Sequence, residues 1–379
     1  MDNLQIATSR TWAEINLENL AGNFKILRKK LSPDAKFLAV CKADAYGHGI
    51  VECAKKLQEC GADYLAVASV TEGVKLRQNG IKIPILCLGQ TNPELAPLIC
   101  EYEITQAVGD FENGEKISKF AQSVNKKIKI HVKIDTGMSR TGFFWADSES
   151  EKEKISAEIK KLCELPGLEA EGIFTHFAAA DDDEDFTRFQ LKKFLDAREN
   201  LFSLGLKFEL SHTAASVGVL KYPEAHLNMG RFGLVLYGYA STDTGNEGSD
   251  LGLKPVMEVK SKITAVRKLP KGSTVSYGRT YTLKRDSLIA VLPIGYADGL
   301  PRILSNKFSV KIHGSLCPVL GRICMDMTMA DVTDLKDVRA GDTAVIFDGD
   351  LVPVAAKNSG TIIHEILCSP SPRVPRVFL

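Results

Sequence analysis

The first 240 residues alternate between short apolar runs and longer charged segments with helical spacing. Eight runs rich in Val, Ile and Ala end in a polar residue or a glycine: 37–42, 64–69, 85–89, 104–108, 128–135, 170–176, 208–213 and 227–233. Eight strand–helix units in about 240 residues have the number and size of an α/β (β/α)8 TIM-like barrel. An open doubly wound sheet is the alternative, but no G-x-G-x-x-G motif follows the first run, which disfavours its dinucleotide-binding form.

The pattern changes near residue 241. Residues 242–255 are polar and rich in glycine, which is typical of a linker. Beyond them helical periodicity is scarce, and strand-like runs dominate, at 256–266, 288–293, 309–313, 317–320 and 344–346. We therefore expect a barrel over 1–241, a linker over 242–255 and a β-rich domain over 256–379.

Composition narrows the class of partner. The net charge is +1, so the chain has no strong field to attract nucleic acid or an anionic membrane. No apolar run reaches the ~20 residues of a membrane span, and residues 1–11 lack the apolar core of a signal peptide. The nine cysteines form no C-x-x-C pair, and the acidic run 181–185 is typical of a solvated loop. The sequence predicts a cytoplasmic protein that binds a small molecule and holds no metal.

Lys42 is the most unusual of the polar residues that close the apolar runs. Burying a charged side chain after a strand costs free energy unless the charge is paired or serves a function. A lone lysine usually avoids this cost because its long aliphatic chain lets the ammonium reach solvent. Here Tyr46 lies four residues on, and Gly47 and Gly49 allow close backbone approach. A desolvated lysine has a lowered pKa, which suits a Schiff base or proton transfer.

Other ends of the predicted strands carry a similar set of polar side chains. They are Lys133, Arg140, His176, His212, Ser216 and Arg231. Each alone could be structural, but together they indicate a site for an anionic polar ligand. The Ser216 hydroxyl and the N–H groups of Gly233 and Leu234 follow the last two strands, where such barrels commonly hold phosphate. No Walker P-loop is present, so a nucleotide is not indicated.

Three clusters stand out in the second domain: SYGRTY at 276–281, GYADG at 295–299 and CMDM at 324–327. Each could be a turn or core packing on its own. Together with AVCKADAYGHG, KIDTGMSRTG and NMGRFGL they resemble the alanine racemases, a family of barrel-type enzymes that use pyridoxal phosphate (PLP). The similarity extends from TWAEINLENLAGN near the start to the final RVPRVF.

The resemblance implies a role for each matching residue. Lys42 would hold PLP and act as the base on one face of the substrate, and Tyr277 of the partner subunit would serve the other face in a homodimer with shared active sites. Arg231 would face the pyridine nitrogen, supported by His212. Further cofactor contacts would come from Tyr46, His176, Ser216, Gly233, Leu234 and His364, and substrate contacts from Arg140, Met325 and Tyr296. Lys133 matches a lysine that many members carry in carbamylated form.

The implied reaction is the interconversion of L-alanine and D-alanine, which supplies D-alanine for peptidoglycan. Two positions depart from the family pattern: Ala215 stands where asparagine is common, and His364 where a tyrosine is usual. A serine or broad-specificity racemase is therefore an alternative. A PLP-binding regulatory protein is disfavoured because that class usually lacks a second domain. A barrel-type decarboxylase would carry a late catalytic cysteine motif, whereas Cys324 lies in CMDM.

Overall fold

The computed structural model describes residues 3–240 and 251–379, which divide into two compact units. The barrel unit comprises residues 23–45 and 50–236. The β unit comprises residues 1–22, 46–49 and 237–379. The division follows tertiary packing rather than chain order, because the N-terminal segment packs with the C-terminal part of the chain. Most of the predicted linker lies outside the described residues.

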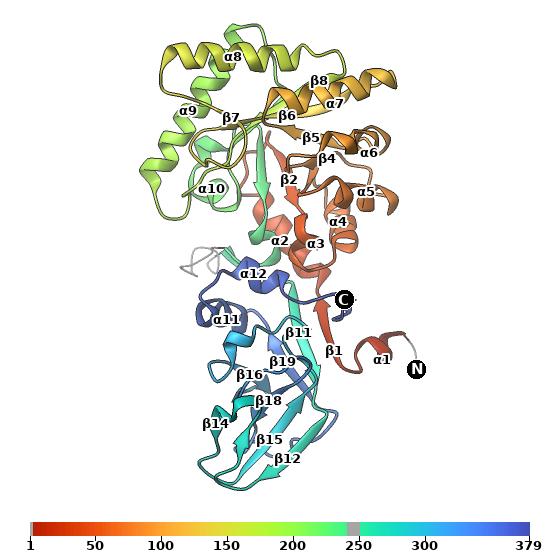
Figure 1. Ribbon diagram of the computed structural model, residues 1–379, viewed down its shortest axis with the longest axis vertical. Helices are drawn as coiled ribbons and strands as arrows, with labels where there is room; N and C mark the ends of the chain where they lie inside the picture. The colour runs from red at the N-terminus through yellow and green to blue at the C-terminus, as the bar shows by residue number, and fades with distance from the viewer. Residues whose placement is uncertain (1–2, 241–250) are drawn as a thin grey trace. The chain divides into compact units, whose positions relative to one another are not determined.

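The barrel unit is built from eight parallel strands (Figure 1). They are β2 (Lys36–Val40), β3 (Tyr64–Val67), β4 (Ile85–Cys87), β5 (Thr105–Val108), β6 (Ile128–Asp135), β8 (Leu168–Phe174), β9 (Leu210–His212) and β10 (Met229–Phe232). Their order is β10-β2-β3-β4-β5-β6-β8-β9, and the end strands β9 and β10 contact each other, so the barrel is nearly closed. A short strand, β7 (Phe143–Phe144), pairs with β6. All eight apolar runs are confirmed as barrel strands.

Helices alternate with these strands. They are α2 (Leu17–Arg28), α4 (Ile50–Glu59), α5 (Val70–Gln78), α6 (Ala96–Glu101), α7 (Phe111–Ser123), α8 (Glu149–Cys163), α9 (Glu184–Ser203) and α10 (Ser216–Lys221). Side-chain caps fix three of the N-termini: Ser69, Asp110 and Asp183 each accept a hydrogen bond from a backbone N–H of the first turn. Asp183 belongs to the acidic run, so part of that run begins α9.

Aromatic packing reinforces the parallel pairing of β10 with β2. The rings of Phe37 in β2 and Phe232 in β10 stack with centroids 3.9 Å apart, and Phe24 of α2 packs on Phe37 at 4.4 Å. All three side chains are buried. This contact joins the two strands that carry Lys42 and Arg231 near their carboxyl ends.

The β unit contains a six-stranded sheet that begins with the N-terminal segment. Its order is β17 (Ser315–Pro318), β16 (Ser309–Ile312), β19 (Thr343–Phe347), β11 (Met257–Lys262), β1 (Thr11–Ile15) and β20 (Arg376–Phe378). Figure 1 shows the red strand β1 beside the teal strand β11, with which it pairs antiparallel. An ion pair of 2.5 Å between Glu14 and Lys260 crosses this pairing.

Two smaller sheets complete the unit. One has the order β12 (Ala265–Leu269), β15 (Ser287–Leu292) and β18 (Thr328–Asp331), and the other pairs β13 (Thr274–Val275) with β14 (Tyr281–Thr282). The apolar run 256–266 is therefore divided between two strands. Helices α11 (Leu351–Ser359) and α12 (Ile363–Cys368) were not expected from the pattern. No helix within residues 3–240 and 251–379 has the length and apolar character to cross a membrane.

Candidate active site

Lys42 lies just past the carboxyl end of β2, at the start of an unusual left-handed turn, α3 (Lys42–Tyr46). Ala43, Asp44 and Ala45 have φ values of 54°, 53° and 57°, and Tyr46 has 53°. Residues other than glycine pay roughly 1–2 kcal/mol each in this region, so the turn needs strong support from its surroundings. Backbone strain of this kind is concentrated at functional sites.

Hydrogen bonds within the barrel unit hold this turn. The Asp44 carboxylate accepts from the backbone N–H of Ile50 at 3.0 Å. Glu72 accepts from the N–H groups of Asp44 and Ala68, at 3.3 Å and 2.9 Å. These hydrogen bonds fix the backbone of the turn, so they also fix the position from which the Lys42 side chain extends.

Lys133 is a buried cation in β6, and it faces other cations. Its side chain lies 5.3 Å from the centre of the Phe174 ring. Burial, reinforced by the positive charges of Arg140 and Arg231, lowers the pKa of Lys133 to about 8. The charge of Lys42 also acts on this group. The positive charges of Lys42, Arg140 and Arg231 therefore all act on Lys133, and this concentration of positive charge suits an anionic ligand.

Arg231 is buried in β10, and its two terminal nitrogens, Nη1 and Nη2, donate several hydrogen bonds. Its guanidinium donates to Nδ1 of His212 at 2.8 Å, to the carbonyls of Thr175 and Thr213 at 2.9 Å and 2.8 Å, and to Nδ1 of His176 at 3.1 Å. Burial lowers its pKa to about 9, which still leaves it protonated at neutral pH. Burial, and then the charge of Arg231, lower the pKa of both histidines, so both rings are neutral.

Ser216 and Gly233 meet at the end of the last two barrel strands. The Ser216 hydroxyl oxygen accepts a hydrogen bond of 3.0 Å from the Gly233 N–H. Because the oxygen is the acceptor, the hydroxyl proton remains able to donate to a ligand oxygen. Leu234 follows at once, at the start of the 3-10 turn Leu234–Tyr237. The predicted phosphate residues of the barrel unit are therefore neighbours in space.

Tyr46 and His364 belong to the β unit and lie side by side there. Their ring centroids are 5.7 Å apart, and Tyr46 also packs on Tyr237 at 4.9 Å. Gly47 lets the chain approach α12, since a Cβ at this position would lie 2.3 Å from the carbonyl oxygen of Leu367. His364 thus sits beside a predicted phosphate-binding residue.

Three exposed side chains of the β unit come from loops that pack on one another. Tyr277, Tyr296 and Met325 are 70%, 43% and 53% exposed. The Tyr296 N–H donates to the Cys324 carbonyl at 3.0 Å. The Ser276 hydroxyl donates to the Arg322 carbonyl at 2.5 Å. The predicted catalytic tyrosine and two predicted substrate residues therefore lie on connected loops.

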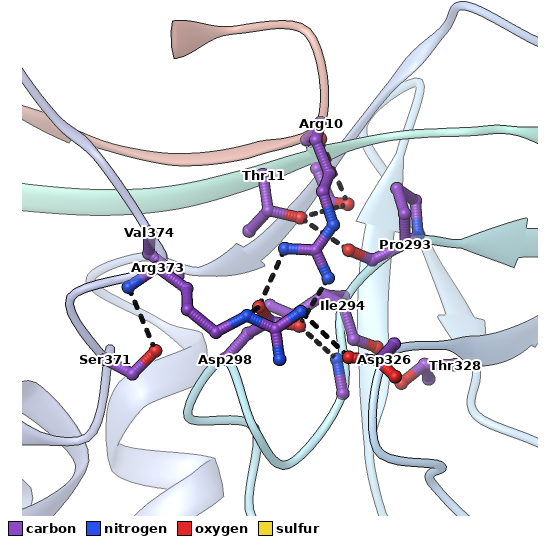
Figure 2. A network of polar contacts seen from close by, with 12 residues as sticks. Arg10, Thr11, Pro293, Ile294, Asp298, Asp326, Thr328, Ser371, Arg373 and Val374 are labelled. Atoms are coloured by element: carbon purple, nitrogen blue, oxygen red, sulfur yellow. Dashed lines mark hydrogen bonds and ion pairs between the residues drawn. The ribbon is translucent and has the colours of Figure 1, made fainter.

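A charged network supports the loop that carries Tyr296 (Figure 2). Asp298 is buried, and its carboxylate accepts two hydrogen bonds from Arg10, at 2.7 Å and 2.8 Å. It also accepts from the Gly295 N–H at 3.0 Å. Arg373 lies 3.5 Å from Asp298 and donates to Asp326 at 2.8 Å, so one network holds both the 295–298 loop and the residue after Met325.

The structure gathers the predicted site residues within the two units. The barrel unit holds Lys42, Lys133, Arg140, His176, His212, Ser216, Arg231, Gly233 and Leu234, and the β unit holds Tyr46, Tyr277, Tyr296, Met325 and His364. Sequence reasoning missed Arg10 and Asp298, whose pairing joins distant segments. His131 and Glu171 were also not predicted, because polar site residues are expected at strand ends and both of these lie inside strands.

Comparisons with known proteins agree with this geometry. Residues 15–241 match the family model described as alanine racemase, N-terminal domain, and residues 256–378 match alanine racemase, C-terminal domain. The alanine racemase of Desulforamulus reducens is 42% identical over 371 residues, covering 97% of this chain and 98% of that protein. A structure of alanine racemase from Clostridium difficile 630 has a TM-score of 0.93 at 41% identity, covering 98% of this chain and 96% of that one. A Bartonella henselae alanine racemase with covalently bound pyridoxal phosphate has a TM-score of 0.86 at 27% identity, covering 98% of this chain and 99% of that one. The chain belongs to the alanine racemase family.

Proposed function

We propose that this enzyme interconverts L-alanine and D-alanine by a two-base mechanism with PLP bound through Lys42, and that it supplies D-alanine for peptidoglycan. The observation that carries the proposal is the cluster of Lys42, Lys133, Arg140 and Arg231 at the carboxyl ends of the barrel strands. These cations suit a ligand that carries both a phosphate and a carboxylate. The Bartonella henselae relative, which holds PLP covalently, supports the same cofactor.

The donor set fits PLP. The Ser216 hydroxyl and the Gly233 and Leu234 N–H groups would hold its phosphate together with Tyr46, and His176 would pack near its ring. When bound, PLP draws electron density from the substrate Cα and so makes its proton easier to remove. Arg231 can only donate a hydrogen bond, so a ring nitrogen facing it stays unprotonated. That limits delocalisation into the ring and disfavours side reactions such as transamination.

Racemisation needs one base on each face of Cα. Lys42 Nζ would take or return the proton on one face, and the phenol oxygen of Tyr277 of the partner subunit would do so on the other. One base on each side completes the exchange without turning the substrate over. Tyr277 is 70% exposed in the single chain, which supports a role in a site shared with a second copy.

The remaining predicted residues would position the substrate. Arg140 and the Met325 backbone N–H would bind its carboxylate, and Tyr296 would line the entrance. Met325 and Tyr296 are exposed on loops that are connected by hydrogen bonds to each other and to the loop of Tyr277. A homodimer would therefore bring all three side chains to the active site together. The sequence has an odd number of cysteines, nine, and no C-x-x-C pair, which supports a cytoplasmic location where thiols stay reduced.

Lys133 would be carbamylated. Its pKa of about 8 leaves a substantial neutral fraction near that pH, and a neutral amine can attack CO2. The nitrogen forms a new bond to carbon and releases one proton, which replaces a buried cation with a carbamate anion. That anion would pair with Arg140 and brace it, whereas the unmodified ammonium repels it.

A serine or broad-specificity racemase is a second candidate. The observation that favours it is the place of His364 beside Tyr46, where the family usually has a tyrosine. An imidazole is smaller than a phenol and offers a donor or an acceptor to a substrate hydroxyl.

Borohydride reduction tests the central assignment. The purified protein should be yellow, and reduction should fix the cofactor on the peptide that contains Lys42. The racemisation of L-alanine, which is measured as the appearance of D-alanine, should be lost in Lys42→Ala. A label on another lysine, or a colourless protein that still racemises alanine, would overturn the proposal.

A further inference from the structure

A chain of buried side chains extends from Arg231 into the interior of the barrel. Arg231 donates to Nδ1 of His212, and Nε2 of His212 lies 2.8 Å from Nδ1 of His131. Nε2 of His131 lies 3.3 Å from Oε2 of Glu171. Both histidines are fully buried and Glu171 is nearly so. The relay, defined as Arg231, His212, His131 and Glu171, therefore joins a predicted cofactor residue to a carboxylate on another strand.

The two ends of the relay fix the direction of every hydrogen bond in it. Arginine can only donate, so Nδ1 of His212 must accept and its Nε2 carries the proton. Nδ1 of His131 then accepts from His212, and its Nε2–H donates to the Glu171 carboxylate, which can only accept. Burial lowers the pKa of each ring, so both imidazoles are neutral and each has one defined tautomer.

Glu171 is held as a carboxylate. Tyr64 donates its hydroxyl to Oε2, and Lys129 lies 2.7 Å from Oε1. These hydrogen bonds and that of His131 outweigh burial and lower the pKa of Glu171 to about 2. Tyr64 begins β3 and Lys129 is the second residue of β6, so the anion lies toward the amino ends of the strands. Arg231 is near the carboxyl end of β10.

The backbone makes specific room for His131. Its register partner on β8 is Gly172, and the pairing of β6 with β8 shifts between Ile130 and His131. A Cβ at position 172 would lie 2.7 Å from Cε1 and Nδ1 of the His131 ring. The imidazole thus occupies space that is available only because position 172 is a glycine. The neighbouring residue, Glu171, carries the carboxylate that the imidazole contacts.

The buried charge of Arg231 needs compensation. Among the described residues, its hydrogen bonds go to two histidines and two carbonyls, and no described ion pair joins it to a carboxylate. An isolated buried cation is costly, and polar networks in a low dielectric polarise one another. The relay supplies a route by which the Glu171 charge can act on Arg231.

We infer that Glu171 is a positioning residue for Arg231 and its remote counter-charge, acting through His131 and His212. The relay keeps the guanidinium protonated and orients it as a donor toward the cofactor ring. The inference rests on the proposed function for the role of Arg231 at the cofactor. The relay itself exists in the protein whether or not PLP is bound, so the two can be tested separately.

The tautomers give the first test. Histidine ring 15N spectra are recorded on the purified full-length protein, with and without added PLP, and His131→Asn and His212→Asn assign the two signals. Both rings should be neutral near pH 7.5 and carry the proton on Nε2. A proton on Nδ1 of either ring, or a charged ring, would overturn the relay. Failure of PLP to bind would leave this result unaffected and would count against the proposed function alone.

Kinetics give the second test. Glu171→Gln removes the charge and keeps an acceptor, and it should lower kcat/KM by about 2- to 30-fold, the range typical of coupling through a network, mainly through kcat. In the His131→Phe background the same substitution should cause no further loss, because the relay is already broken. Equal losses in both backgrounds would show that Glu171 does not act through His131.

Matched controls separate the relay from a general packing defect. Tyr64→Phe and Lys129→Met remove the other two partners of Glu171 but leave its contact with His131. Both should lower the unfolding temperature while changing kcat by less than about 2-fold. If they reduce kcat as much as Glu171→Gln does, Glu171 has only a structural role.

Gly172→Ala offers a second way to displace the His131 ring without removing a polar group, and it should reproduce the kinetic effect of His131→Phe.

Discussion

Arg10 and Asp298 are 288 positions apart in the sequence, yet two guanidinium nitrogens of Arg10 contact both carboxylate oxygens of Asp298, at 2.7 Å and 2.8 Å (Figure 2). The pair joins the segment before β1 to the loop that carries Tyr296. A two-point contact of this kind fixes orientation as well as distance. The N-terminal segment is therefore part of the support for a predicted active-site loop.

Asp298→Asn should weaken this support. The substitution removes the charge that Arg10 and Arg373 share, and it should lower the free energy of unfolding by about 1.5–3 kcal/mol, as for other hydrogen bonds to charged groups. KM for alanine should rise because the neighbouring Tyr296 and Met325 lose their fixed positions. Thermal or denaturant unfolding and steady-state kinetics provide the measurements.

The control for this prediction is Arg339→Gln. Arg339 has a side chain that is 86% exposed and lies 3.8 Å from Asp342, so its loss should change stability by less than about 1 kcal/mol. If Asp298→Asn is as mild as this surface change, the Arg10 pair does not support the loop.

Lys133 should take up CO2 in a pH-dependent way. Its ammonium loses the proton as the pH rises through its pKa of about 8, and only the neutral amine reacts. The carbamylated fraction should therefore increase from pH 7 to pH 9 at fixed bicarbonate, and it should fall at lower pH. 13C-labelled bicarbonate and NMR of the protein would detect the carbamate.

Lys129 provides an internal comparison on the same strand. Its hydrogen bond to Glu171 raises its pKa, so it stays protonated over this range and should not react. The carbamate signal should vanish in Lys133→Ala and persist in Lys129→Met. A signal that survives in Lys133→Ala would assign the modification to another residue.

The barrel could be predicted well from the sequence because its parallel strands are buried on both faces and appear as continuous apolar runs. Lys42 and Arg231 could be found because catalytic groups collect where such strands end. His131 and Glu171 could not, because nothing in a local pattern distinguishes a polar residue inside a buried strand from one that faces solvent. The place of β1 beside β11 also depends on a pairing of Thr11 with Ser261, far apart in the chain.

The short helices of the β unit escaped prediction for a local reason. α11 contains Pro353 and three valine or leucine residues in its first turn, which resemble the neighbouring strands in composition. Its end is marked only by Gly360, which adopts a left-handed conformation with φ of 67°. Tertiary packing, rather than helix propensity, decides the structure of such segments.

Activity should require two subunits. Lys42→Ala and Tyr277→Phe should each be inactive, because each removes one of the two proposed bases. After subunit exchange, a mixed dimer would contain one intact site, so random mixing should restore roughly a quarter of the wild-type activity. Activity of the mixture, compared with each variant alone, is the measurement.

Exchange must be demonstrated separately, for example by differently tagged subunits that co-purify. Recovery without exchange, or exchange without recovery, would each contradict a site shared between subunits. In the second case each chain would build its site alone, and the exposed Tyr277 would need another explanation.

His364 should widen the substrate range. Its ring lies 5.7 Å from that of Tyr46, at a position where a tyrosine would be larger and would fill more of the space beside a substrate side chain. We expect His364→Tyr to shift the ratio of kcat/KM for alanine over serine towards alanine. Small steric differences in a pocket change the selectivity between two substrates by about 1–3 kcal/mol of activation free energy. Alanine should therefore remain a good substrate of the wild-type enzyme.

A second variant is needed to separate the size of the residue 364 side chain from its hydrogen bonding, and it should add bulk without adding a hydroxyl. His364→Phe restores bulk and removes the polar atoms of the imidazole, so it separates the effect of space from that of hydrogen bonding. If space dominates, both variants should favour alanine to a similar degree. If hydrogen bonding to the serine hydroxyl dominates, His364→Phe should reduce serine turnover more than His364→Tyr, whose hydroxyl can still donate or accept. An unchanged alanine-to-serine ratio in both variants would show that His364 does not set the substrate range.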